Sequence, residues 1–174
     1  LTGAGISAES GIQTFRASDG LWENHSVYDV ATPEGFKRNP ELVWRFYRER
    51  YNQAASVEPN PGHYALKSLE EFLGDNFLLI TQNVDGLHKR AGSERVIEMH
   101  GSLQSTFCSE CRKLYPMSMY ITENGVPECP SCRGAVRPDI VWFGEVPYEM
   151  EKIYDFLETI DYLLVCGTSG SVYP

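Results

Sequence analysis

"FLLITQN", residues 77–83, is the stretch that decides the fold, because four apolar residues stand directly before three polar ones. A short continuous apolar run of this kind is typical of a strand buried on both faces of a parallel sheet. The segment before it, "GHYALKSLEEFLG" at 62–74, predicts an amphipathic helix that ends at Gly74. The residues that we expect on its apolar face are Tyr64, Leu66, Leu69, Phe72 and Leu73.

The same order of elements is expected once more, and a further part of the chain is expected to be helical. "EKIYDFLETIDYLLVCGTS" at 151–169 predicts a helix, then the strand "YLLVC", then a polar loop. "TPEGFKRNPELVWRFYRERYNQAAS" at 32–56 predicts helices capped by Thr32 or Asn39, with prolines in their first turns. Helices that alternate with buried strands indicate an α/β fold with a parallel sheet covered by helices.

Composition and charge exclude several classes of protein. The 174 residues are 42% hydrophobic and 12% aromatic, which suits one globular domain or a domain with a small insertion. We expect no membrane span and no export signal, since no apolar stretch approaches roughly 18 residues. A net charge of -9 argues against direct nucleic-acid binding. The chain begins at Leu1 and stops after an expected strand, so we expect a piece of a longer protein.

Cysteine spacing predicts a metal site in a small separate module. Cys108 and Cys111 form one C-x2-C pair, Cys129 and Cys132 form another, and 17 residues separate the pairs. Four thiolates suit a structural tetrahedral zinc ion, whereas disulfides or unliganded thiols are the alternative. Zinc is favoured because we expect no export signal. Cys166 is expected to be an inert core thiol.

Glycine spacing at the start of the chain is compatible with a dinucleotide site. Gly3, Gly5 and Ala8 fit G-x-G-x-x-G/A, in which a backbone turn approaches a pyrophosphate at a helix N-terminus. The acidic residue expected about 20 positions later has no counterpart at the end of a strand. From this motif alone, a dinucleotide site and an ordinary tight turn both remain open.

Polar loops after the expected strands favour a ligand pocket. "TQNVDG" at 81–86 follows "FLLI", and "GTS" at 167–169 follows "YLLVC". Ligands of open parallel sheets bind at the carboxyl ends of the strands, although such loops also serve as caps and turns. His100 in "MHGSL" is a candidate general base or a structural histidine. His25, His63 and His88 receive less weight, since none stands beside a glycine after an apolar strand.

Six motifs together resemble one known family. "GAGISAESGIQTFR", "TQNVDGLH", "HGSL", the paired C-x2-C module, "VWFGE" and "GTSGSVYP" stand in the order found in sirtuins, the NAD-dependent protein lysine deacylases. The sequence looks most like the bacterial, class III branch. The resemblance implies a Rossmann-like domain at 1–107 and 133–174, with helices on both faces of its sheet. It also implies a zinc ribbon at 108–132 and a helical insertion at about 31–58. The family pattern continues beyond both ends of this chain.

The resemblance also assigns residues to NAD and to zinc. The residues expected to contact NAD are Gly3, Ala4, Gly5, Ile6, Ser7, Ile12, Phe15, Arg16, Gln82, Asn83, Val84, Asp85, Gly167, Thr168 and Ser169. Among them, Asn83 and Asp85 would hold the nicotinamide amide and Arg16 would supply a charge-assisted contact near the phosphates. One zinc ion would hold the small module in place and take no part in the reaction.

The reaction and the substrate site follow from the same resemblance. The acyl oxygen of an acylated protein lysine would attack the ribose C1′, nicotinamide would leave, and His100 would activate a ribose hydroxyl to give 2′-O-acyl-ADP-ribose. The substrate backbone would add as a strand beside Val141, Phe143, Gly144 and Glu145. Tyr47 and Arg50, as Y-x-x-R on one helix face, match the feature of desuccinylases and demalonylases.

Two other functions remain open from the sequence. An NAD-linked oxidoreductase would transfer hydride and raise the absorbance at 340 nm, whereas a deacylase releases nicotinamide. A non-catalytic zinc-ribbon and nucleotide-binding module would not need His100. We expect a cytoplasmic protein, with a mitochondrial location left open for a eukaryotic source.

Overall fold

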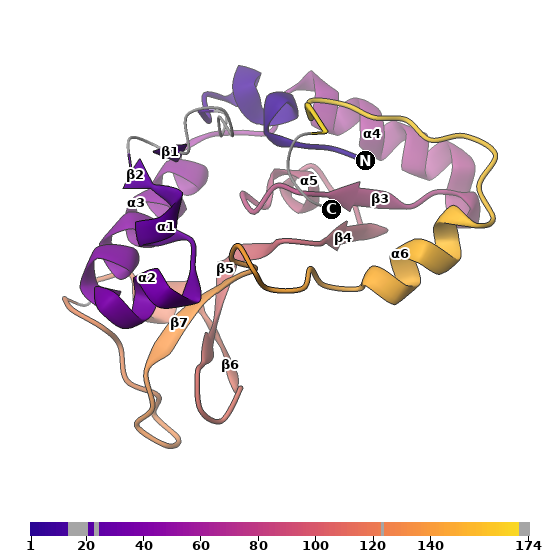
Figure 1. Ribbon diagram of the computed structural model, residues 1–174. Helices are drawn as coiled ribbons and strands as arrows, with labels where there is room; N and C mark the ends of the chain where they lie inside the picture. Colours follow the sequence, from indigo (N-terminus) through magenta and orange to yellow (C-terminus); the bar gives the residue numbers. More distant parts are fainter. Residues whose placement is uncertain (14–20, 23–24, 123, 171–174) are drawn as a thin grey trace.

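The buried run after Phe77 forms strand β3 (Leu79–Thr81), which pairs in parallel with β4 (Val96–Glu98) (Figure 1). All three residues of β3 are buried. Isolated parallel bridges join Thr2 to Thr81 and to Cys166, so the start of the chain lies between β3 and the segment after the last helix. The prediction of an α/β fold with a parallel sheet is therefore confirmed.

This computed structural model describes residues 1–13, 21–22, 25–122 and 124–170. The remaining elements, in chain order, are η1 (Ala4–Ser10), β1 (Leu21–Trp22), β2 (His25–Ser26), α1 (Val27–Val30), α2 (Pro33–Arg38), α3 (Pro40–Ser56), α4 (Pro61–Leu73), η3 (Gly74–Asn76), α5 (Leu87–Arg90), β5 (Gly101–Cys108), β6 (Leu114–Pro116), η4 (Met117–Met119), β7 (Val136–Ile140) and α6 (Met150–Leu157). In the described part of the chain, no helix combines the length and apolar character needed to cross a membrane.

Capping side chains fix where the helices begin, as predicted. The Thr32 hydroxyl accepts from the Gly35 amide at the start of α2, and the Asn39 side chain accepts from the Leu42 amide at the start of α3. A proline occupies the first turn of each helix, where its missing N–H is not needed. Asn60 caps α4 in a reciprocal capping box with His63.

The expected apolar face of α4 is wrong in part. Leu66 is buried, but its neighbours in the core are His63 and Glu70, whereas Tyr64 is 50% exposed and Phe72 is 85% exposed. The polar residues are buried because each has partners inside: Glu70 accepts two backbone amides, from Glu94 and Arg95. Hydrogen bonding to tertiary partners therefore overrides hydropathy on this helix.

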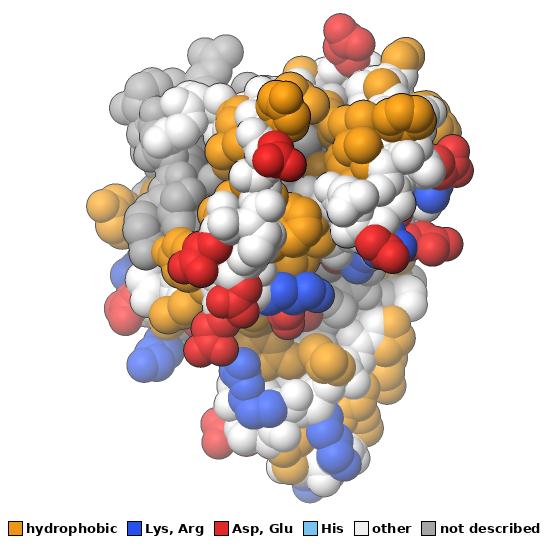
Figure 2. Space-filling model, turned by 90° about the vertical axis from the view of Figure 1, so that its right-hand side faces the viewer, with side chains coloured by type: hydrophobic (Ala, Val, Ile, Leu, Met, Phe, Trp, Pro, Cys, Tyr) orange, Lys and Arg blue, Asp and Glu red, His pale blue; other side chains and the backbone are white. Residues whose placement is uncertain are grey.

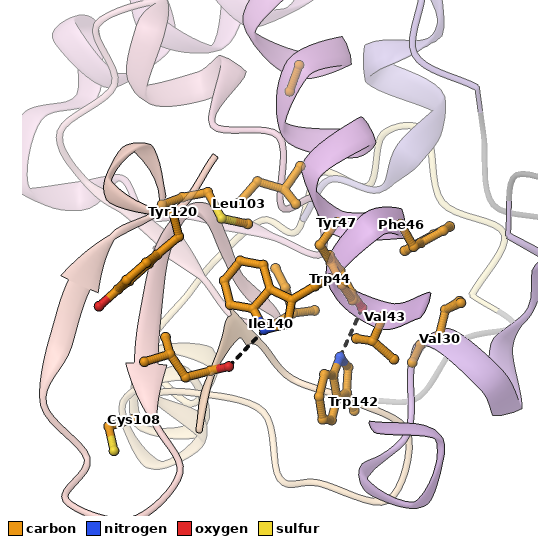
Figure 3. Packing of buried hydrophobic residues seen from close by; sticks show 14 of the residues in the cluster. Val30, Val43, Trp44, Phe46, Tyr47, Leu103, Cys108, Tyr120, Ile140 and Trp142 are labelled. Carbon is orange, nitrogen blue, oxygen red and sulfur yellow. Dashed lines mark hydrogen bonds between the residues drawn. The ribbon is translucent and has the colours of Figure 1, made fainter. Parts of the chain in front are cut away.

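The cysteine segment is carried by an antiparallel sheet with strand order β6-β5-β7. Figure 1 shows this sheet below the parallel one, beside α3. Trp44 and Tyr47 of α3 pack in one core with Trp142 and with residues of the cysteine-bearing segment (Figure 3). Trp44 Nε1 donates to the Val136 carbonyl at 2.9 Å, so this large apolar contact leaves the buried indole N–H satisfied. The proposed domain boundaries stay a prediction.

The expected strand "YLLVC" is wrong as a buried strand. Tyr162 is 93% exposed, and Leu163, Leu164 and Val165 are each at least half exposed. The bridge between Thr2 and Cys166 and a bond from the Leu1 amino group to the Leu164 carbonyl join this segment to the start of the chain, and Cys166 is half-buried rather than in the core. Figure 2 views the molecule from the side on which this segment lies, and hydrophobic side chains gather in the upper part of that face.

Candidate active site and metal centre

A cavity of about 560 Å³ lies where the loops at the ends of several strands meet, within the size range of ligand sites. It is lined by η1 and the loop after β3, by the loop after β7, by α3, and by residues 167–169. The lining residues are Ala4, Gly5, Ser7, Ile12, Gln13, Trp22, Ala31, Arg50, Gln53, Ala54, Gln82, Asn83, Val84, Asp85, His100, Leu103, Ile140, Val141, Trp142, Phe143, Gly144, Glu145, Pro147, Gly167, Thr168 and Ser169.

Two glycine loops form one wall by packing backbone against backbone. The Gly5 amide donates to the Gly167 carbonyl at 2.7 Å. A Cβ on Gly5 would lie 2.8 Å from the Gly167 Cα, and a Cβ on Gly3 would lie 2.6 Å from the Thr168 Cβ. Gly167 has a φ of +67°, which also favours glycine. The glycine spacing is therefore required by loop-to-loop packing.

Three buried polar side chains form one end of the cavity. Ser7 Oγ donates to Asp85 Oδ2 at 2.7 Å and accepts from Asn83 Nδ2 at 3.1 Å. The other carboxylate oxygen of Asp85 accepts from the Leu87 amide. The Asn83 amide nitrogen is thus directed inward, and its carbonyl oxygen remains as an acceptor. Such a rigid amide suits recognition of a carboxamide.

His100 lines the cavity with one ring nitrogen held from behind. Its Nδ1 lies 3.1 Å from the Gln82 carbonyl. A carbonyl only accepts, so Nδ1 carries the proton and Nε2 carries the lone pair in the neutral ring. Burial lowers the pKa of His100, and the bond to Gln82 opposes this effect. The ring is therefore neutral at physiological pH and able to accept a proton at Nε2.

The loop after β7 forms the opposite wall. The amides of Val141, Phe143 and Glu145 donate to the His100, Ala31 and Trp142 carbonyls. The Glu145 carboxylate accepts two bonds from Arg137, at 2.7 and 2.9 Å, and one from the Trp142 amide at 2.8 Å. Glu145 thus borders the cavity while its charge is directed toward Arg137.

The two residues of the Y-x-x-R pair of α3 lie at different depths from the cavity. Arg50 lines the cavity, with its guanidinium over the Phe46 ring and 3.7 Å from Glu49. Tyr47 is 0% exposed and lies behind the wall, where its hydroxyl accepts from Trp142 Nε1 at 2.9 Å (Figure 3). Burial raises the pKa of Tyr47, so the phenol stays protonated. The assignment of both residues to an acyl carboxylate stays a prediction.

Most of the predicted ligand residues line this one cavity, including His100, Asn83 and Asp85. Gly3 and Ile6 support it from behind, and Phe15 and Arg16 lie outside the described residues. Sequence reasoning missed Trp142, although it stands inside "VWFGE". It also missed a set of apolar wall residues that carry no motif: Ala31, Ala54, Leu103 and Ile140.

The four paired cysteines form a metal site away from the cavity. Their Sγ atoms all lie within 4.8 Å of one another, with Cys108 and Cys132 at 3.4 Å and Cys111 and Cys129 at 3.7 Å. Sulfurs about 2.3 Å from a tetrahedral zinc ion are roughly 3.8 Å apart. These separations fit zinc and are too long for disulfides. The tetrathiolate site leaves no position open for a substrate.

Comparisons with known proteins agree with the fold. The family model of the Sir2 family matches residues 3–174. An "NAD-dependent protein deacylase" from Pasteurella multocida is 57% identical over 176 residues, covering 100% of this chain and 75% of the relative. A solved complex of a mutant Sir2 homologue with ADP-ribose has a TM-score of 0.91 at 41% identity, covering 100% and 70% of the two chains. A Sir2 structure bound to a propionylated peptide has a TM-score of 0.86 at 35% identity, covering 100% and 71%. The chain belongs to the Sir2 family.

Proposed function

We propose that this protein is an NAD-dependent protein lysine deacylase that removes succinyl and malonyl groups as well as acetyl groups. The observation that carries the proposal is a single cavity that joins a neutral histidine and a carboxamide-binding end to the guanidinium of Arg50. Four cysteines free to bind zinc support a reducing location such as the cytoplasm.

The polar end of the cavity would bind the nicotinamide half of NAD. Nicotinamide would be recognised by Asn83, whose carbonyl oxygen can accept from the carboxamide N–H while Ser7 and Asp85 hold the side chain. Ile12 contributes an apolar wall beside them. When bound, NAD supplies an electrophilic ribose carbon and nicotinamide as the leaving group.

His100 would act as the general base for a ribose hydroxyl. Its Nδ1–H is held by Gln82, which directs the lone pair of Nε2 away from that carbonyl. Because the pKa of His100 is lowered, the ring is already neutral at physiological pH and can accept a proton directly. Thr168 Oγ1 donates to Gln82 Oε1 at 2.9 Å and so ties the two ligand loops together.

The acylated lysine would enter along the loop after β7. Backbone amides of Val141, Trp142, Phe143 and Glu145 already have acceptors within the protein. A substrate strand therefore has to donate to carbonyl oxygens of this loop or accept from Gly144. Backbone pairing of this kind gives affinity with little sequence discrimination, which suits an enzyme with many protein substrates.

Arg50 would select acyl groups that end in a carboxylate. Its side chain is 14% exposed, so a carboxylate in the cavity would meet the guanidinium in a largely dehydrated place. Acetyl groups lack that carboxylate. A charge-assisted bond of about 1.5–3 kcal/mol corresponds to roughly 10- to 100-fold in kcat/KM.

The test compares succinyl-lysine and acetyl-lysine peptides by mass spectrometry, with and without NAD. Arg50→Met should lower desuccinylation roughly 10- to 100-fold while changing deacetylation by less than about threefold. Arg45→Met is the matched control, because Arg45 is exposed on the same helix. Equal losses on both peptides would refute the role of Arg50. Turnover without NAD, or a rise in absorbance at 340 nm in place of nicotinamide release, would refute the deacylase proposal.

A further inference from the structure

Two buried histidines stand directly behind the polar end of the cavity without lining it. His63 of α4 is 0% exposed and His88 of α5 is 3% exposed, and their ring centroids are 4.8 Å apart. Neither residue has a role in the reaction described above. Their hydrogen bonds, however, both lead to Asn83.

The direction of the bonds around His63 follows from its partners. The Asn60 amide donates to His63 Nδ1 at 3.2 Å, so the neutral ring carries its proton on Nε2. That nitrogen lies 3.4 Å from Ser7 Oγ. Ser7 gives its own proton to Asp85 and accepts from Asn83 Nδ2. The proton and both lone pairs of the Ser7 hydroxyl therefore have partners.

His88 supports the backbone of Asn83 by a second route. Its Nε2 lies 2.9 Å from Thr2 Oγ1, which donates to Thr81 Oγ1 at 2.8 Å. Because the Thr2 proton is used in that bond, His88 Nε2 is the donor to Thr2. Thr81 Oγ1 also accepts from the Asn83 amide at 3.1 Å. Asn83 is thus fixed through its side chain by one histidine and through its backbone by the other.

We propose that His63 is a positioning residue for the nicotinamide half of NAD, an inference that rests on the proposed function. The Ser7 proton goes to the Asp85 carboxylate, and His63, by donating to Ser7, occupies one lone pair of the hydroxyl and leaves the other for Asn83 Nδ2. The Asn83 carbonyl oxygen is then the group left for a carboxamide. Without the donor, Ser7 still donates to Asp85, but one lone pair of its hydroxyl has no partner and Asn83 Nδ2 is no longer confined to the other.

Two substitutions separate this role from simple stability. His63→Asn keeps an acceptor near Nδ1 for the Asn60 amide but places no donor at Ser7. His63→Leu keeps similar volume and also lacks the donor. His63→Gln restores a donor at about the reach of Nε2. Leu66→Ala, at a buried residue one turn along the same helix, is the control for destabilised packing.

The measurement is calorimetric binding of NAD and of ADP-ribose, which lacks nicotinamide. We expect NAD affinity to fall roughly fivefold or more in His63→Asn and His63→Leu, with ADP-ribose affinity within about twofold of wild type. His63→Gln should bind both ligands like wild type, and Leu66→Ala should lower thermal stability without changing the ratio of the two affinities.

The outcomes are distinct. Unchanged NAD affinity in both loss variants, or a parallel fall for ADP-ribose, would overturn the positioning role and leave the deacylase intact. The same change in ratio for Leu66→Ala would show that α4 acts through packing alone. A wild-type protein that binds neither NAD nor ADP-ribose would overturn the proposed function itself. If one loss variant does not fold, the other gives the same readout.

Discussion

Replacing Glu145 with alanine should destabilise the protein by about 3 kcal/mol, because it leaves the buried charge of Arg137 without its main partner. Arg137 is 7% exposed, and its guanidinium lies 3.4 Å from the Trp142 ring centroid and 4.8 Å from that of Phe107. After the change, the bond to the Ile140 carbonyl at 2.8 Å remains. Arg137 Nε has no hydrogen-bond partner among the described residues.

The magnitude follows from the unequal burial of the two partners. Breaking a buried ion pair costs about 3–5 kcal/mol, and the low end applies because the Glu145 side chain is 32% exposed and water can enter. Arg137→Met removes the buried charge instead, and leaves a carboxylate that still accepts from the Trp142 amide. That change should cost only about 1–2 kcal/mol. Burial alone would raise the pKa of Glu145, but hydrogen bonds from Arg137 and Trp142 lower it overall.

Urea unfolding followed by circular dichroism, at fixed zinc content, measures both variants and their double mutant. The expected order of destabilisation is Glu145→Ala first, Arg137→Met second, with the double mutant well below the sum of the two. A loss of about 3 kcal/mol corresponds to roughly 6–12 °C in Tm for a chain of this size. Additive effects, or a larger loss for Arg137→Met, would refute the account of a buried charge held by Glu145.

Three further predictions concern other parts of the molecule. Chelation should release one zinc ion per chain and unfold the three-stranded sheet, observed as a loss of zinc and a shift of tryptophan fluorescence; unchanged fluorescence after zinc loss would contradict it. Gly101→Ala should lower stability by about 3 kcal/mol or more and reduce turnover at the adjacent His100, because Gly101 has a φ of +84° and its Cβ would lie 2.0 Å from the Asp139 carbonyl oxygen. Burial, then the charge of a neighbouring histidine, lowers the pKa of His88 to about 4, so the unfolded chain binds more protons below the ordinary pKa of 6.5. The contribution of His88 to the free energy of unfolding should therefore fall by about 2 kcal/mol between pH 7.5 and pH 5, and His88→Asn should reduce the pH dependence without abolishing it, because burial also lowers the pKa of His63 and His100.

Sequence patterns predicted the features that depend on residues close together in the chain. The caps Thr32 and Asn39 bond to amides three residues away, so the residue type and its position are sufficient. The cysteine set was predictable for a similar reason, since each pair spans a single turn. The cavity residues after β3 followed from the rule that ligands bind at strand ends.

Hydrogen bonds between side chains that are distant in the sequence could not be predicted in this way. Nothing in "VWFGE" indicates that Glu145 turns to Arg137, or that Trp142 takes the hydroxyl of Tyr47 as its acceptor. His63 and His88 received less weight because neither stands beside a glycine after an apolar strand. Their bonds to Ser7 and Thr2, residues far away in the sequence, have no local sequence signal. The segment "YLLVC" has the composition of a buried strand, but burial depends on what packs against it.

Helix α3 explains how a metal that does not line the cavity can still affect it. Trp44 and Arg48, one turn apart on α3, donate to the Val136, Tyr120 and Gly125 carbonyls, all in or beside the segment that the zinc site holds. Tyr47 lies on the same side of the helix and accepts from Trp142. The helix is therefore fixed to the cysteine-bearing module along one face, and Arg50, three residues beyond Tyr47, reaches the cavity from the next turn. Since none of the four cysteines lines that cavity, a zinc ion bound to them would affect the cavity only through the position of α3. Under the proposed function, the position of α3 would then set where Arg50 meets the carboxylate of an acyl group.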